Sequence, residues 1–126
     1  MIRSLKVALI LYGAIHVLFG FGFIVAPQLV GSISGFDELA PSALYVMAML
    51  GGGFIAVSFL LIVTGLNPLE HISGLKFAIL WSVLGVVTQL YSVLQGVVDF
   101  SQAGTGIICD AVFAIAFLAL YPYRRQ

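Results

Sequence analysis

Charge is what this sequence has least of. Only 8% of its 126 residues are charged, and five basic residues balance five acidic ones, whereas soluble domains carry about 25% charged residues. With no basic arm or patch to meet phosphates, the composition excludes nucleic acid as a partner. Hydrophobic residues make up 62% of the chain and the mean hydropathy is +1.19. These values indicate an integral membrane protein rather than a soluble domain.

Cysteine and catalytic motifs are also scarce. The lone cysteine, Cys109, excludes a disulfide within the chain, a CxxC redox pair and a four-cysteine metal or cluster site. The glycine triplet 51–53 lacks the following Lys and Ser/Thr of a phosphate-binding loop. Neither a Ser-His-Asp triad nor a pair of catalytic carboxylates is evident. We therefore predict no metal site and can name no catalytic residue, and an enzyme is the less favoured class.

Four apolar runs dominate the chain. About 20 apolar residues suffice to cross a bilayer as a helix that rises 1.5 Å per residue. The runs predict spans at about 4–26, 42–65, 74–99 and 105–122. The loop between the first two spans contains a segment, 29–36, that could lie at the membrane interface. The sequence thus predicts a single all-α transmembrane domain, an antiparallel four-helix bundle.

The charges that remain are sorted by side. Four spans place both termini on one face of the membrane. All five basic residues then fall on that face, namely Arg3, Lys6, Lys76, Arg124 and Arg125, while Asp37, Glu38 and Asp99 fall on the other. The positive-inside rule predicts cytoplasmic termini. A short chain without eukaryotic sorting signals favours a prokaryotic plasma (inner) membrane.

A polar stripe runs along the third predicted span. Steps of four and three residues align Trp81, Gly85, Thr88, Ser92, Gln95 and Asp99 on one helical face, with Gln89 beside them. Unpaired amides and hydroxyls in hydrocarbon each cost a kcal/mol or more, by order of magnitude. The stripe is therefore expected to face other helices or a wet cavity.

Two ionisable residues lie inside predicted spans, where such groups are functional candidates. Asp110 falls about one turn inside the outer end of the fourth span. If it is sequestered from water, its protonated form is favoured and it could carry a proton; the alternative is a carboxyl hydrogen-bonded to Ser, Thr or Gln near the interface. His16 lies mid-span, one turn from Tyr12. Its structural interpretation is a hydrogen bond to Gln89 or Thr88, and its functional ones are a proton relay with Asp110 or haem ligation. A second intramembrane histidine for haem is absent.

The depths of these polar residues form a ladder. At a rise of 1.5 Å per residue, His16 and Gln89 lie about 15 Å below the outer surface and Ser92 lies about 10 Å below it. Asp110 and Gln95 lie about 6 to 9 Å deep, and Asp99 is at the surface. We expect a polar cleft between the first, third and fourth spans that opens outward and is sealed on the cytoplasmic side. Its candidate ligand- or proton-binding residues are these six together with Tyr12.

Small residues predict where helices meet, because lipid supplies no hydrophobic drive for helix association. Ala48, Gly52 and Ala56 recur at four-residue spacing in the second span. Gly20 in the first span and Gly106 in the fourth supply further points of close approach. Surplus glycines could serve a homo-oligomer or a larger membrane complex.

Several features together resemble a known family. They are the basic start at Arg3, the glycines Gly13 and Gly20, the closing Pro27, the triplet 51–53 and an acidic residue in the last hairpin. Over its whole length the chain resembles the small four-span bacterial membrane proteins of the DoxX-like type. The resemblance implies a quinone-side or accessory role and carries over no catalytic residue.

Three functions remain open on the sequence. The first is an accessory or lipophilic-ligand-binding membrane protein with a polar cleft open to the extracytoplasmic side. The second is an oligomeric proton-linked transporter or channel subunit that uses Asp110 and His16. The third is a quinone-associated membrane oxidoreductase subunit. No cofactor is predicted, and quinone or haem would enter only with the third.

Overall fold

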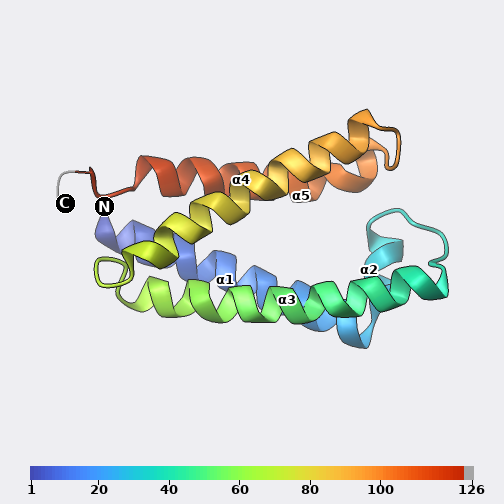
Figure 1. Ribbon diagram of the computed structural model, residues 1–126, viewed down its shortest axis with the longest axis horizontal. Helices are drawn as coiled ribbons and strands as arrows, with labels where there is room; N and C mark the ends of the chain where they lie inside the picture. The colour runs from blue at the N-terminus through green and yellow to red at the C-terminus, as the bar shows by residue number, and fades with distance from the viewer. Residues whose placement is uncertain (124–126) are drawn as a thin grey trace.

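The chain folds into helices joined by short connections (Figure 1). The computed structural model describes residues 1–123. Its helices are α1 (Ile2–Val25), α2 (Pro27–Ile33), α3 (Pro41–Leu66), α4 (Ile72–Leu94) and α5 (Phe100–Ala119). All but α2 are long and apolar enough to cross a membrane. The predicted all-α bundle with four spans is confirmed.

The long helices associate as two antiparallel pairs, α1 with α3 and α4 with α5 (Figure 1). Glycine allows the first pair to approach closely. A Cβ added at Gly51 would lie 2.6 Å from the backbone oxygen of Gly20, and one added at Gly20 would lie 2.9 Å from the backbone oxygen of Gly51. The two backbones therefore touch, as the small residue at Gly20 predicts.

The small-residue face predicted for the second span is wrong as a contact within the chain. Gly52 and Ala56 are exposed and Ala48 is only half-buried. A Cβ at Gly52 would meet nothing within 4 Å. One residue along a helix rotates the side-chain direction by about 100°, so the contact at Gly51 turns Gly52 away from α1.

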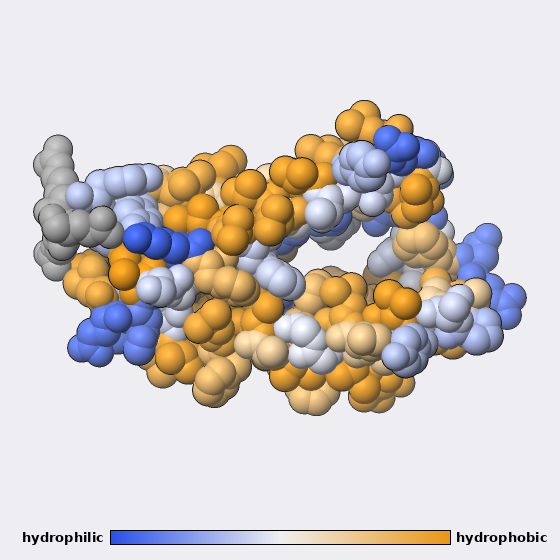
Figure 2. Space-filling model, in the orientation of Figure 1, coloured by the Kyte–Doolittle hydropathy of each residue, from blue (hydrophilic) through white to orange (hydrophobic). Residues whose placement is uncertain are grey.

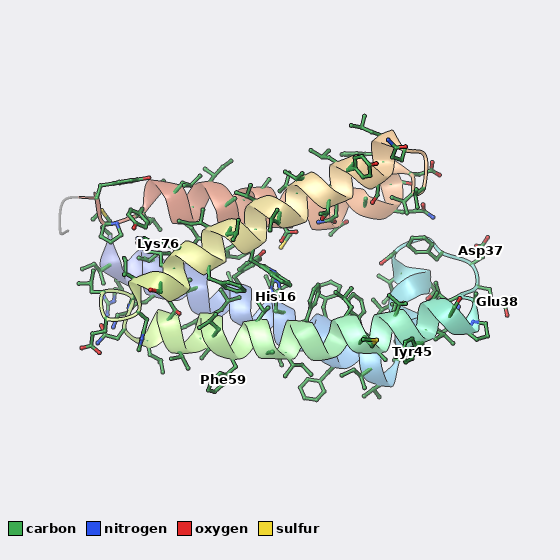
Figure 3. The ribbon with its side chains drawn as sticks, viewed as in Figure 1. His16, Asp37, Glu38, Tyr45, Phe59 and Lys76 are labelled. Atoms are coloured by element: carbon green, nitrogen blue, oxygen red, sulfur yellow. The ribbon has the colours of Figure 1, made fainter. Side chains whose placement is uncertain are left out.

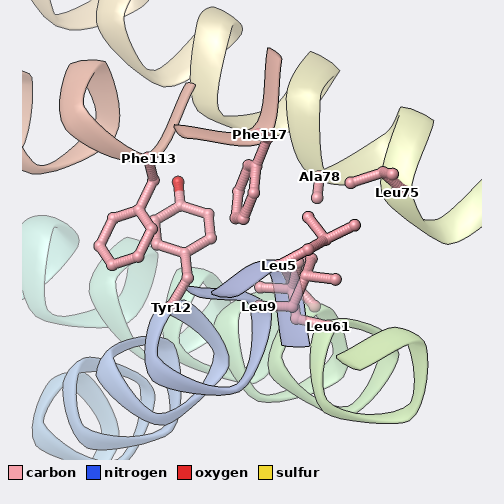
Figure 4. Packing of buried hydrophobic residues seen from close by; sticks show 9 residues of the cluster. Leu5, Leu9, Tyr12, Leu61, Leu75, Ala78, Phe113 and Phe117 are labelled. Atoms are coloured by element: carbon pink, nitrogen blue, oxygen red, sulfur yellow. The ribbon is translucent and has the colours of Figure 1, made fainter. Parts of the chain in front are cut away.

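The hydrophobic core lies in the half of the bundle where α1 and α4 begin and α3 and α5 end, and Figure 4 shows how its side chains pack. All four long helices contribute to it, through Leu5, Leu9, Tyr12, Val57, Leu61, Leu75, Ala78, Phe113 and Phe117. The buried residues of α4 are confined to its first part and end at Ser82. The hydrophobic core thus joins the two helix pairs at one end only.

The other half, here called the α2 end, is open between the pairs. Figure 2 shows a gap between the α4–α5 pair and the α1–α3 pair there. Helix α2 overlaps the segment 29–36 that was expected at the interface. It ends shortly before Gly35, whose φ is +85°, and the loop then continues to α3.

The third span is shorter than predicted, and the reason is a glycine cap. Gly96 has a φ of +69°. Its amide bonds the carbonyl of Val93 at 3.0 Å, and the amide of Val97 bonds that of Ser92 at 3.0 Å. This is the Schellman arrangement that ends a helix. The predicted end at Asp99 is therefore wrong, and α5 begins directly after Asp99 instead of at 105.

Candidate functional site

Asp110 joins three helices. From α5, its Oδ1 accepts a hydrogen bond from the Tyr12 hydroxyl of α1 at 2.6 Å, and its Oδ2 accepts one from Gln89 Nε2 of α4 at 2.9 Å. A Cβ at Gly85 would overlap the carboxyl group, so this glycine makes room for it. No Lys or Arg occurs from residue 7 to 75 or from 77 to 123. Neutral donors alone therefore satisfy the carboxyl group, as the structural interpretation with a Gln partner expected.

The position of the Tyr12 hydroxyl is fixed by aromatic packing (Figure 4). Tyr12 is fully buried. Its ring stacks on Phe113 with centroids 4.5 Å apart and meets Phe117 edge-on at 5.6 Å. Since Phe113 and Phe117 are on the same helix as Asp110, one surface of α5 holds both the ring and the group that its hydroxyl bonds. The sequence placed Tyr12 beside His16 but did not identify it as the partner of Asp110.

The hydrogen-bond partners of His16 hold it as a neutral imidazole. Trp81 Nε1 donates to His16 Nε2 at 2.8 Å, so Nε2 is the acceptor. Nδ1 lies 2.9 Å from the Tyr12 carbonyl oxygen, which can only accept, so Nδ1 carries the proton. The predicted partners Gln89 and Thr88 are wrong, because Trp81 occupies the site. With both nitrogens engaged, the residues present do not fit axial haem ligation.

Tyr12 stands between the two candidate ionisable residues. Its backbone carbonyl faces His16 and its hydroxyl faces Asp110. Among the hydrogen bonds of residues 1–123, none joins His16 directly to Asp110. We call the five residues Tyr12, His16, Trp81, Gln89 and Asp110 the polar network. It links α1, α4 and α5 at the level where the two helix pairs begin to separate.

A groove opens next to this network, toward the α2 end. Its volume is about 270 Å³, and its walls are Phe36, Thr88, Gln89, Ser92, Val98, Gln102 and Ala103. Gln89 therefore belongs to both features: its amide bonds Asp110 and its side chain lines the groove. Gln102 Nε2 donates to the Gly35 carbonyl at 3.2 Å and ties the start of α5 to the loop that carries Phe36.

The groove differs in part from the predicted cleft. Ser92 and Gln89 line it, but α1 supplies no wall, and the loop residue Phe36 takes that place. Gln95 is exposed at the C-cap of α4. Asp99 is exposed as the N-cap of α5, where its backbone amide donates to Gln102 Oε1 at 2.9 Å. Neither residue lines the groove.

The remaining candidates are placed as follows. A Cβ at Gly106 would overlap the Gln89 side chain, so Gly106 lies at the α4–α5 contact as expected. The sequence does not single out four of the wall residues: Phe36, Val98, Gln102 and Ala103. Gln102 could have been identified from the sequence, because it follows Asp99 at the three-residue spacing of a capping box, which marks the start of a helix. Within residues 1–123 no three His, Cys, Asp or Glu residues gather as a metal site.

Comparisons with family models, with curated proteins and with solved structures find no match for this chain. What the four apolar helices show is its class. It is a small helical membrane protein.

Proposed function

We propose that this protein binds a small lipophilic molecule in the groove between α4, α5 and Phe36. The polar wall residues would hold a head group, and the gap between the helix pairs would let an apolar tail reach the bilayer (Figure 2). The observation that carries the proposal is the double role of Gln89, which lines the groove while it bonds the half-buried Asp110. Pockets that combine an apolar surround with a few convergent polar groups are the usual form of ligand sites.

We propose that the groove opens on the extracytoplasmic side and that both termini are cytoplasmic. Support comes from the separation of charge along the bundle. Lys76 lies at the end with the termini, whereas Asp37 and Glu38 lie at the α2 end (Figure 3). Lys6 is also at the terminal end, where its Nζ donates to the Leu66 carbonyl at 2.7 Å. The same rule would count Arg124 and Arg125, which lie outside the described residues.

An accessory role in a homo-oligomer or a larger complex belongs to this proposal, as does the DoxX-like resemblance. Support is the exposed face of α3 around Gly52 and Ala56, where a Cβ at Gly52 would meet nothing. Small residues on a membrane-facing surface permit close approach by another helix. Native mass spectrometry in a mild detergent would report the number of copies directly.

Filling the groove should abolish binding. Ala103 lines the groove from α5, so Ala103→Trp would occupy the space of the head group. We expect native mass spectra of the parent to show a retained ligand mass that this variant lacks. Ala119→Trp is the matched control, since Ala119 is exposed at the other end of α5. A ligand mass equally retained by Ala103→Trp, or absent from the parent, would contradict the proposal.

Proton transfer through Asp110 is a second candidate, favoured by a carboxyl group that sits between three helices with only neutral partners. In liposomes carrying the protein, we expect a pH gradient to decay faster than in protein-free liposomes. Asp110→Asn should remove that flux, because an amide cannot exchange a proton at this site. Asp37→Asn, on an exposed loop, should leave it unchanged. Parent liposomes no leakier than empty ones would eliminate this candidate.

A further inference from the structure

The two hydroxyl groups in the groove have already used their hydrogens. Ser92 Oγ donates to the Thr88 carbonyl at 3.0 Å, and Thr88 Oγ1 donates to the Leu84 carbonyl at 2.8 Å. A carbonyl oxygen can only accept, so each hydroxyl hydrogen must point into the helix backbone. What these side chains can offer a ligand is therefore the lone pairs of their oxygens.

The side-chain amide of Gln89 likewise has no hydrogen left to donate to a ligand. Its Nε2 donates to the Gly85 carbonyl at 3.0 Å and to Asp110 Oδ2 at 2.9 Å, which uses both amide hydrogens. The orientation of the amide is fixed, because the Gly85 carbonyl could not donate to an oxygen placed there. Only Oε1 remains, and it is again an acceptor.

Among the polar side chains of the groove wall, that of Gln102 alone has a hydrogen left to donate. Its Oε1 accepts from the Asp99 amide, and its Nε2 gives one hydrogen to the Gly35 carbonyl. One N–H is left, at the rim of the groove. The groove therefore offers a ligand one side-chain donor, on Gln102, and three side-chain acceptors, the oxygens of Thr88, Gln89 and Ser92.

The charged residues at this end of the molecule also favour a ligand that donates hydrogen bonds and carries positive charge. The helices and loop that form the groove contain no Lys or Arg other than Lys76, which lies at the opposite end (Figure 3). Asp37, Glu38 and Asp99 surround the α2 end as exposed residues. An anionic head group would find no opposite charge there, whereas a cation would be attracted.

We propose that the groove selects a lipophilic primary ammonium compound, whose head both donates hydrogen bonds and carries positive charge. This rests on the proposed function and narrows its ligand class. Acceptor oxygens bind such a head through charge-assisted hydrogen bonds. A quinone head offers only acceptors, so the groove does not fit it. The cavity of about 270 Å³ holds the head and the first methylenes, and the rest of the tail extends into the bilayer.

A matched set of photoreactive probes tests the selectivity. Amine, alcohol, methyl ketone and carboxylate probes with the same diazirine-bearing dodecyl tail would be added to the protein in phosphatidylcholine nanodiscs. Adducts would be mapped by peptide mass spectrometry. We expect groove adducts of the amine to exceed those of the ketone and carboxylate by at least about tenfold, with the alcohol between.

The outcomes separate the two proposals. Adducts that Ala103→Trp abolishes but that favour the ketone or the carboxylate would overturn the ammonium selectivity and leave groove binding intact. Adducts that Ala103→Trp does not reduce, for any probe, would overturn both. Adding phosphatidylethanolamine distinguishes the source of the ammonium group: competition with the amine probe indicates a lipid head group, and its absence indicates a free amine.

A charge introduced into the groove gives an independent test. Ser92→Lys should lower the yield of amine adducts by at least about tenfold and raise that of carboxylate adducts, because it places a cation among the acceptors. Gln95→Lys adds the same charge at the exposed end of α4, outside the groove, and should change neither yield. Equal effects of the two variants would contradict selection by the groove.

Discussion

Replacing Gly51 by valine is expected to lower the free energy of unfolding by about 3 kcal/mol, the upper part of the usual range for overpacking. A Cβ at this position would lie 2.6 Å from the Gly20 backbone oxygen and 2.9 Å from Ile24 Cγ1. A flexible side chain can move aside, but the backbone of α1 cannot move without separating from α3. Unfolding in mixed micelles of a mild detergent and SDS would measure the loss.

The neighbouring glycine supplies the control. Gly52 is on the same helix at nearly the same depth, and a Cβ there would meet nothing within 4 Å. Gly52→Val should change the free energy of unfolding by less than about 0.5 kcal/mol in monomeric protein. Comparable losses for the two variants would mean that the α1–α3 contact is not where the structure places it. A loss for Gly52→Val that depends on protein concentration would instead identify an interface between copies.

This pair of residues also shows why helix contacts were harder to predict than helices. Length and hydropathy determine that four segments cross a membrane, and all four were predicted. Which face of a helix meets its neighbour depends on the neighbour's side chains, here Phe23 and Ile24 against Gly51. Three successive glycines look alike in the sequence. The four-residue spacing of Ala48, Gly52 and Ala56 predicts a contact at Gly52, whereas the contact with α1 forms at Gly51.

Helix ends depended on backbone conformation. The third span was extended to Asp99 because polar residues continued at helical spacing. Gly96, with its left-handed φ of +69°, ends the helix earlier and removes Gln95 and Asp99 from the stripe. A glycine after a long apolar run is a known stop signal, and here it ends the helix although polar residues continue at helical spacing beyond it.

The sequence predicts which polar residues form the candidate site better than it predicts which of them bond to one another. The cost of bare polar groups in lipid required Gln89, Asp110 and His16 to find partners, and each did. The pairing of His16 with Trp81 depends on how α4 crosses α1, which no local pattern reports. Phe36 lies on the loop after α2, which the hydrogen bond of Gln102 to Gly35 connects to α5, and these residues are far apart in the sequence.

Removing the Tyr12 hydroxyl is expected to cost about 2 kcal/mol of unfolding free energy. Tyr12→Phe keeps the ring between Phe113 and Phe117 but leaves Asp110 Oδ1 without its donor. Lys and Arg are absent from residues 77 to 123, so α5 and most of α4 offer no cation in its place. Tyr45→Phe is the matched control, because Tyr45 is 67% exposed, and it should have no measurable effect.

The partner substitution turns this loss into a measure of the contact itself. Asp110→Leu should cost about 3 kcal/mol, since it leaves the buried Tyr12 hydroxyl and one N–H of the Gln89 amide unpaired. When Tyr12→Phe and Asp110→Leu are combined, both sides of the contact become apolar, so the loss should fall short of the sum by at least about 1 kcal/mol. Strict additivity would show that the 2.6 Å bond contributes nothing to stability. Because α1 and α5 belong to different helix pairs, a coupling of this size would identify the bond as a main connection between the pairs at the level where the groove begins.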